Sequence, residues 1–172
     1  MRMLKAIKFA KKAHEGQRRK YTHQSYYEHC LAVARTVASI GESMDTIIAA
    51  LLHDTVEDNE TIEIIHIVEN FGEKVGQLVY EVTDQSKKSD GNRKIRKEID
   101  RQHLAKASSS GQTIKLADLI DNTRSIEVYD PDFAKIYMKE KRALLEVLIH
   151  GNEDLMDTAR RIVDGYFKRN GK

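Results

Sequence analysis

The order of hydrophobic and polar positions along this 172-residue chain predicts a protein built from helices. In most segments apolar residues recur every three to four positions, and few segments show the strict alternation that is typical of a strand. One proline and nine glycines favour long helices, because both residue types interrupt them. The predicted helices span about residues 3–15, 26–40, 44–52, 61–71, 73–83, 93–107, 113–128, 130–149 and 153–167. An all-α fold class follows from this pattern.

Polar segments separate the predicted helices without dividing the chain into domains. Residues 17–25 form a polar, basic loop, residues 85–92 are polar, and residues 108–111 form a break. Ser43 is placed to cap the helix over residues 44–52, which is apolar on nearly all sides and should be central. Since no internal repeat or low-complexity linker is found, residues 1–172 are expected to form a single compact domain.

Composition and charge argue against several classes of protein. With 40% hydrophobic and 33% charged residues, the chain is typical of a globular protein. No stretch approaches the ~18 apolar residues of a membrane span, and the N-terminal segment does not resemble a secretory signal. A single cysteine, Cys30, cannot form an internal disulfide, so a cytoplasmic location and no membrane partner are expected. The net charge of +2, and acidic neighbours of the basic segment 87–97, argue against a nucleic-acid partner.

The segment from 49 to 58 carries the strongest chemical signal. An apolar helix over residues 49–52 is followed at once by His53, Asp54, Glu57 and Asp58. Buried groups of this kind need partners, because burial of an unpaired polar or charged group costs several kcal/mol. His53 and Glu57, like Asp54 and Asp58, are four residues apart and share a helix face. One reading is a metal site; the other is a helix end where His53 is an ordinary core histidine.

Two further elements strengthen the metal reading. Asp118 lies between apolar positions of a predicted buried helix, with Asn122 one turn later, and His29 begins another apolar helix. Taken singly, Asp118 could instead pair with a residue such as Arg124, and His29 could be structural. Together the elements offer two imidazoles and two carboxylates, a set that suits Mn²⁺, Fe²⁺, Co²⁺ or Zn²⁺ better than Ca²⁺ or Mg²⁺. Such an ion keeps positions for water and substrate, as hydrolysis of phosphate esters requires.

The order of His, His-Asp and Asp resembles that of the HD-domain phosphohydrolases. The similarity is closer to the hydrolase domain of RelA/SpoT-type alarmone enzymes, and it runs in the same order from about residue 4 to 125. The segments that carry it are residues 9–20, 51–58, 70–72, 82–83 and 115–118, together with Asn122 and Arg124. The chain therefore looks like a stand-alone small alarmone hydrolase, because it has no room for a synthetase domain.

The resemblance implies an HD-domain helical bundle with one divalent metal ion, most often Mn²⁺. It implies a nucleotide substrate, (p)ppGpp, from which the 3′-pyrophosphate is removed to give GDP or GTP. The ligands that carry over are His29, His53, Asp54 and Asp118. Glu57 and Asp58 carry over as the catalytic acidic pair, and the substrate-binding positions that match are Arg19, Lys20 and Asn122. Without the resemblance, the basic residues would be read as a solvated loop.

Departures from the family pattern leave the substrate open. Tyr26 keeps the aromatic position before the first histidine and is expected at the substrate, but the family's loop prolines and glycine are missing. Leu119 and Asp121 replace basic and His or Tyr positions, and a carboxylate near a polyphosphate is unfavourable. Tyr137 and Lys141 share a helix face that could contact phosphate. The alternatives are another nucleotide, such as the 2′-phosphate of NADPH or a signalling nucleotide, and a sensor without turnover. The oligomeric state stays open.

Overall fold

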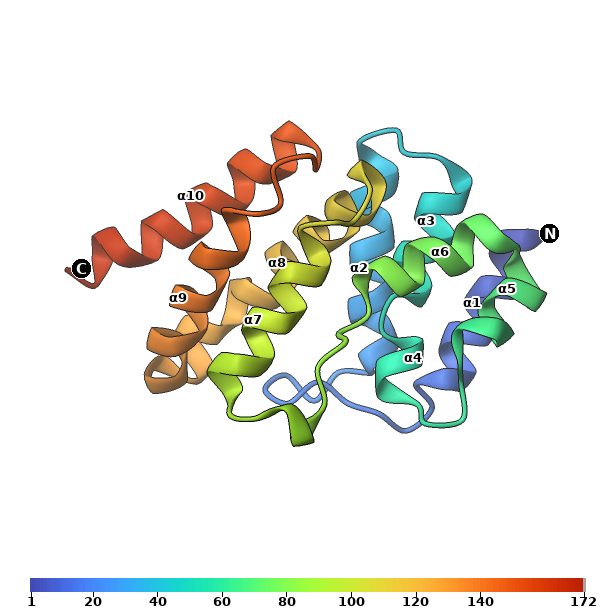
Figure 1. Ribbon diagram of the computed structural model, residues 1–172, viewed down its shortest axis with the longest axis horizontal. Helices are drawn as coiled ribbons and strands as arrows, with labels where there is room; N and C mark the ends of the chain where they lie inside the picture. The colour runs from blue at the N-terminus through green and yellow to red at the C-terminus, as the bar shows by residue number, and fades with distance from the viewer. Residues whose placement is uncertain (172) are drawn as a thin grey trace. The chain divides into compact units, whose positions relative to one another are not determined.

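A computed structural model describes residues 1–171, apart from the side chain at position 125, and shows a chain organised in helices (Figure 1). In this part of the chain, extended pairing is limited to an isolated antiparallel bridge between Arg18 and Ser25. The predicted all-α class is therefore confirmed. Among the described residues, no helix has the length and apolar character needed to cross a membrane. The chain divides into two compact units, residues 1–83 and the part from residue 84 onward.

The first unit is arranged around a central apolar helix, α3. It contains α1 (Arg2–Ala13), α2 (Tyr26–Ser39), α3 (Met44–Leu52), α4 (Thr55–Asp58), α5 (Ile64–Phe71) and α6 (Glu73–Val82). Residues 48–52 of α3 are at most 1% exposed, because α3 packs against α1, α2 and α6. The predicted cap is confirmed, since Ser43 Oγ accepts a hydrogen bond of 3.2 Å from the backbone N–H of Thr46.

Helices α5 and α6 form a tightly packed hairpin in the same unit. Their approach requires a glycine at position 76, because a Cβ atom there would lie 2.3 Å from Val68 Cγ2. The predicted start of α5 at Thr61 is wrong. The backbone N–H and the hydroxyl of Thr61 both bind Asn59 Oδ1, at 3.1 and 2.7 Å, so this segment is a turn and the helix begins at Ile64.

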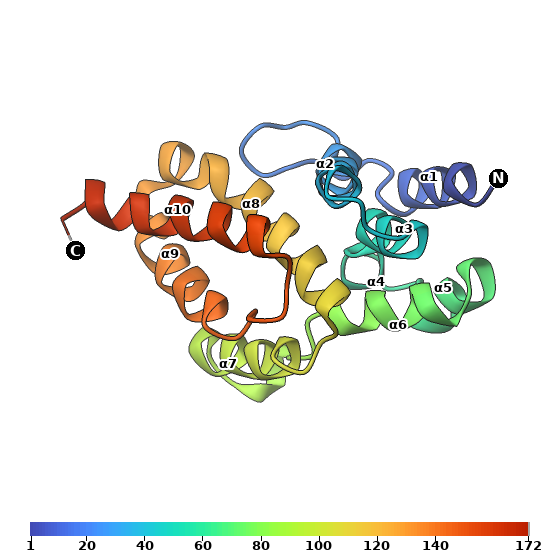
Figure 2. The ribbon, with the colours of Figure 1, turned by 90° about the horizontal axis from the view of Figure 1, so that it is seen from above.

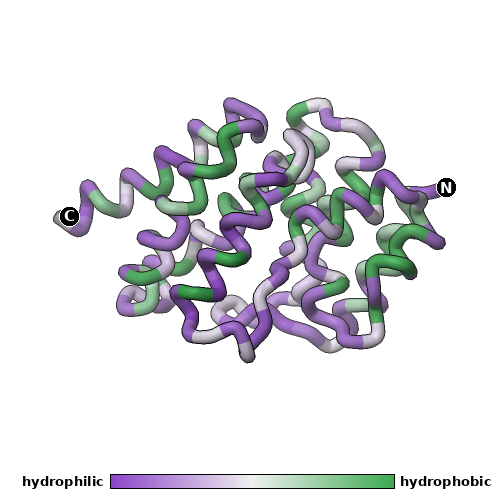
Figure 3. Tube along the Cα trace, viewed as in Figure 1, coloured by the Kyte–Doolittle hydropathy of each residue, from purple (hydrophilic) through white to green (hydrophobic). Residues whose placement is uncertain are grey.

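The second unit packs three long helices together. It contains the 3₁₀ turn η1 (Lys88–Asp90), α7 (Arg93–Leu104), α8 (Ser109–Tyr129), α9 (Pro131–Leu145) and α10 (Glu153–Arg169). Helices α8, α9 and α10 contact one another, and α9 and α10 lie side by side in both ribbon views (Figures 1 and 2). Hydrophobic and hydrophilic positions alternate along α10 (Figure 3), as expected for a helix with one buried face.

Two predicted boundaries of the second unit are corrected. The break expected over residues 108–111 is wrong, since Ser108 Oγ accepts a hydrogen bond of 3.2 Å from the N–H of Gly111 and α8 starts at Ser109. The helix expected to reach residue 149 ends at Leu145. The following turn passes close to α8 at Gly151, where a Cβ would lie 2.5 Å from Leu116 Cδ1. Close packing of this turn therefore requires glycine.

Candidate metal centre

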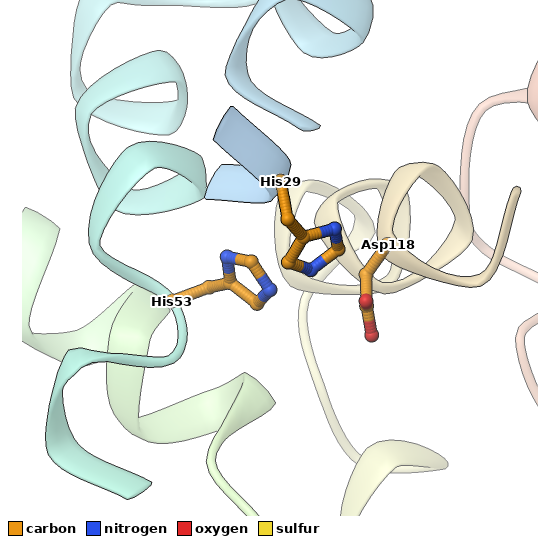
Figure 4. Close-up of side chains that lie close together, drawn as sticks. All are labelled: His29, His53 and Asp118. Carbon is orange, nitrogen blue, oxygen red and sulfur yellow. The ribbon is translucent and has the colours of Figure 1, made fainter. Parts of the chain in front are cut away.

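Two buried histidines of the first unit face the carboxylate of Asp54. His29 lies in the first turn of α2, and His53 follows the last residue of α3. Their Nε2 atoms lie 3.5 Å (His29) and 3.0 Å (His53) from Asp54 Oδ2. The two rings meet edge to face with centroids 5.2 Å apart (Figure 4), and each histidine is 1% exposed. Two nitrogen donors and one carboxylate oxygen therefore converge in the interior of this unit.

A break between two helices brings the neighbours His53 and Asp54 together. Helix α3 ends at Leu52 and α4 begins at Thr55, so both residues lie in the connecting turn. Consecutive side chains of an unbroken α-helix point about 100° apart. In the turn, His53 Nε2 instead comes within 3.0 Å of Asp54 Oδ2. The turn explains how adjacent residues can serve one ion.

Hydrogen bonds orient two of the donor groups. His53 Nδ1 lies 2.9 Å from the backbone carbonyl oxygen of Ala50. Because a carbonyl only accepts, Nδ1 carries the proton and Nε2 keeps the lone pair that a metal ion binds. The hydroxyl of Tyr26 donates to Asp54 Oδ2 over 2.7 Å. Tyr26, expected at the substrate, thus has its hydroxyl on a carboxylate of the centre.

This donor set fits a divalent cation. Imidazole nitrogen combined with carboxylate oxygen suits borderline first-row ions, and a cation would offset the charge of the buried Asp54. Cys30 also offers a donor, since its Sγ and ligand atoms of His53 and Asp54 lie within 4.8 Å of one another. Nothing in the residue spacing indicates this position for Cys30, because it depends on how α2 packs against α3.

The fourth predicted ligand, Asp118, lies in the second unit on α8, where Figure 4 labels it. Its side chain is buried among polar neighbours of its own helix. Lys115 Nζ lies 3.0 Å from Asp118 Oδ2, and Asn122 Nδ2 donates to Oδ1 over 2.5 Å. These partners lie one turn before and one turn after Asp118, as the spacing of Asp118 and Asn122 predicts. Arg124, the alternative partner, is exposed.

The predicted acidic pair lies on α4 of the first unit. Glu57 and Asp58 occupy the short helix that follows the His53–Asp54 turn. Gln17 Nε2 donates to Asp58 Oδ2 over 2.9 Å, and the side chain of Asp58 is 29% exposed. Burial raises the pKa of Asp58, the Gln17 hydrogen bond lowers it, and the nearby Asp54 raises it further, so that its pKa lies above the ordinary value. Such a carboxyl group suits proton transfer.

The basic loop predicted over residues 17–25 is present in the first unit. Arg19 N–H donates to the backbone oxygen of Gln24 over 2.9 Å, and the backbone N–H of His23 donates to the oxygen of Arg19 over 3.1 Å. Lys20 Nζ donates to the hydroxyl of Tyr21 over 3.1 Å and lies 4.7 Å from that ring's centroid. The loop is therefore a closed turn that presents Arg19 and Lys20 from a defined backbone.

The second unit contains a basic cavity of about 660 Å³ between α7, α8 and α9. Tyr137 and Lys141 contact each other on α9, with Lys141 Nζ 4.7 Å from the ring centroid, and Lys141 lines the cavity. The cations of the lining outnumber its carboxylates by seven to four. These cations are Arg93, Lys94, Lys97, Arg101, Lys115, Lys139 and Lys141. Along the sequence, the charge pattern of these residues is that of a solvated face, so it does not indicate a cavity.

Comparison with known proteins identifies the family. The protein-family model for the HD domain matches residues 6–144, which is most of the chain. This chain therefore belongs to the HD-domain family, the class that its helical fold and His-Asp cluster define.

Individual proteins that resemble this chain give a more specific comparison than the family does. The chain is 39% identical over 150 residues to guanosine-3′,5′-bis(diphosphate) 3′-pyrophosphohydrolase of Aquifex aeolicus, covering 85% of this chain and 21% of that protein. It is 38% identical over 134 residues to the pyrophosphohydrolase MESH1 of Xenopus tropicalis, covering 76% of this chain and 72% of MESH1. The solved structure of a metazoan SpoT ortholog that hydrolyses ppGpp matches with a TM-score of 0.85 at 28% identity, covering 99% of this chain and 96% of that one.

Proposed function

We propose that this protein is a metal-dependent nucleotide pyrophosphohydrolase that removes the 3′-pyrophosphate of (p)ppGpp, giving GDP or GTP and pyrophosphate. The observation that carries the proposal is the convergence of His29 and His53 Nε2 on Asp54 Oδ2, 3.5 and 3.0 Å away, in a buried cluster of imidazole and carboxylate donors. The chain spans only 21% of the Aquifex protein but 72% of MESH1, and both relatives are named for this reaction.

The proposed metal ligands are His29, His53, Asp54 and Asp118, and the proposed ion is Mn²⁺. Asp118 fits this role because it is 4% exposed and its carboxylate is oriented from both sides on its own helix. A nitrogen and oxygen donor set accommodates Mn²⁺ as well as Fe²⁺, Co²⁺ or Zn²⁺, and the resemblance to the alarmone hydrolases favours Mn²⁺ among them. A bound divalent cation would supply positive charge for the phosphoryl oxygens and a more acidic water.

The acidic pair of α4 would handle the protons of the reaction. Glu57 and Asp58 hold the attacking water and accept its proton while the water oxygen forms a bond to phosphorus. The bond between that phosphorus and the ribose 3′ oxygen breaks, and the 3′ oxygen receives a proton. The raised pKa of Asp58 favours this exchange, because it makes the carboxylate a stronger proton acceptor.

Basic and polar side chains of both units would bind the nucleotide. Arg19 can stack on guanine or grip a phosphate, whereas Lys20 supplies a point charge. Asn122, Tyr137 and Lys141 are the proposed contacts in the second unit. The match of the HD-domain model to residues 6–144 includes most of both units, so we propose that they act as one functional domain. A cytoplasmic location and the absence of nucleic-acid and membrane partners belong to the same proposal.

The test is turnover of ppGpp by the purified, Mn²⁺-loaded protein, measured beside GTP, dNTPs and NADPH. Release of GDP and pyrophosphate that is abolished by chelator supports the proposal. The His53→Ala variant should lose both bound metal and turnover, measured by elemental analysis and by chromatography of the products. His150→Ala is the matched control, because His150 is an exposed histidine and should leave both unchanged.

Two outcomes would contradict the proposal. Full turnover after chelation, or in metal-free His53→Ala, would remove the metal centre from the reaction. Turnover of NADPH but not of ppGpp would assign the 2′-phosphate substrate instead.

A further inference from the structure

A chain of side-chain contacts in the first unit ends on Asp58 without involving the proposed metal ligands. Cys30 Sγ lies 3.6 Å from His14 Nε2, and His14 Nδ1 lies 2.6 Å from Gln17 Oε1. Gln17 Nε2 then lies 2.9 Å from Asp58 Oδ2. His14 is 1% and Cys30 0% exposed, so the chain begins in the core and ends at the partly exposed carboxylate. We call these four residues the relay.

The donor and acceptor groups of these side chains give the hydrogen bonds of the relay one direction. The carboxylate of Asp58 accepts, so Gln17 must present its NH₂ group there and turn its carbonyl oxygen toward His14. His14 Nδ1 then carries the proton, and in a neutral imidazole this leaves Nε2 as an acceptor for the thiol of Cys30. Every member therefore donates toward Asp58, and each bond determines the orientation of the next group.

The surrounding structure makes the relay rigid. The ring of Tyr26 packs on His14 with centroids 5.1 Å apart, and the backbone N–H of Tyr26 donates to the oxygen of Gln17 over 3.0 Å. Asn59 Nδ2 donates to the backbone oxygen of Ala13 over 3.2 Å, which ties the end of α4 to the end of α1. The backbone of Gln17 is thus held by Tyr26, and its side-chain amide is held by a buried imidazole.

We propose that Gln17, oriented by His14, is a positioning residue that holds the carboxylate of Asp58 for proton transfer. The Gln17 amide bonds to Oδ2, and Oδ1 is assigned to the water or the leaving group. This inference rests on the proposed function, because it assumes that Asp58 is catalytic. A carboxylate on a four-residue helix has several rotamers open to it, and the charge-assisted bond from Gln17 selects one.

The test is a double-mutant cycle between Gln17 and Asp58, with kcat and KM for ppGpp measured in each variant. Asp58→Asn alone should lower kcat by about 10²–10⁴-fold. Gln17→Met keeps the size of the side chain without its donor, and it should lower kcat about tenfold with KM within about twofold. In the Asp58→Asn background, Gln17→Met should change kcat less than about twofold, because its target group is already lost.

Two further variants separate positioning from a general structural role. Gln24→Met is the control, since Gln24 is an exposed glutamine of the same loop, and it should leave kcat unchanged. His14→Asn should retain more of kcat than His14→Leu, because the asparagine amide can replace the Nδ1–H donor whereas leucine cannot. Bound metal should stay at the wild-type level in the Gln17 and Gln24 variants.

Equal losses of kcat from Gln17→Met in both backgrounds would overturn the proposal, because Gln17 would then act elsewhere, for example through the basic loop. A wild-type protein that is inactive on ppGpp would refute the proposed function and not the relay. The midpoints of urea unfolding of the wild type, Gln17→Met, Asp58→Asn and the double variant then decide whether Gln17 holds Asp58. Shifts that do not add confirm that Gln17 holds Asp58, and strictly additive shifts refute it.

Discussion

The hydroxyl of Tyr26 provides the sharpest test of how the centre is built. It donates a 2.7 Å hydrogen bond to Asp54 Oδ2, the oxygen that His29 and His53 also face. A hydrogen bond to a charged group contributes about 1.5–3 kcal/mol to stability. Tyr26→Phe removes this bond, so the metal-free protein should lose stability of that order in urea unfolding.

Tyr26→Phe should weaken metal binding by less than the full free energy of this hydrogen bond. The hydroxyl already holds Asp54 in the metal-free protein. Removal of the hydroxyl therefore makes metal binding less favourable only by the free energy needed to order a loosened carboxylate. Loss of an outer-shell partner typically weakens metal binding 10–100-fold. We expect the low end of that range, about tenfold or ~1.4 kcal/mol.

The assay is a titration with Mn²⁺ in which the free ion is followed by electron paramagnetic resonance. Tyr27→Phe is the matched control on the same helix, because the ring of Tyr27 is buried against Lys11 Nζ, 5.1 Å from its centroid, and takes no part in the centre. Tyr27→Phe should bind Mn²⁺ like the wild type. An unchanged Mn²⁺ affinity in Tyr26→Phe would refute the argument that Asp54 is a ligand oriented by this hydroxyl.

Three further predictions concern chemistry, packing and pH. Glu57→Gln should retain Mn²⁺ and lose about 10²–10⁴-fold in kcat; loss of metal instead would make Glu57 a ligand. Gly76→Ala should cost about 1–3 kcal/mol in urea unfolding, because the new Cβ would lie 2.3 Å from Val68 Cγ2, and a stabilised variant would contradict this. Burial raises the pKa of Asp84, but two lysine ammoniums, including Lys97 at 2.7 Å, lower it below its ordinary value. Ionised Asp84 therefore stabilises the folded state fully above its unfolded-state pKa of about 4, and this stabilisation is lost as pH falls through its folded-state pKa. Lys97→Met should make the unfolding free energy depend less steeply on pH in this acidic range.

Local patterns were enough to predict most of the helices. Apolar periodicity reports which face of a helix is buried, and Ser43 marks where the central helix α3 begins. Two of the three corrected boundaries, at Thr61 and over residues 108–111, are places where a side chain bonds to the nearby backbone. The side chain of Asn59 forms a turn before α5, whereas that of Ser108 starts helix α8. The same polar residue types serve both purposes, so composition alone could not separate them.

Candidate ligands were also visible in the sequence, because His53, Asp54 and Asp118 interrupt apolar runs where an unpaired charge is costly. What only the tertiary structure decided is which atoms meet. The Nε2 atoms of His29 and His53 approach the same oxygen of Asp54 because α2 packs against α3, and because the chain turns between α3 and α4. The link from His14 through Gln17 to Asp58 joins the residue that follows α1, a loop and α4 in the same way. Periodicity describes each segment by itself, whereas these distances depend on the packing of segments far apart in the chain.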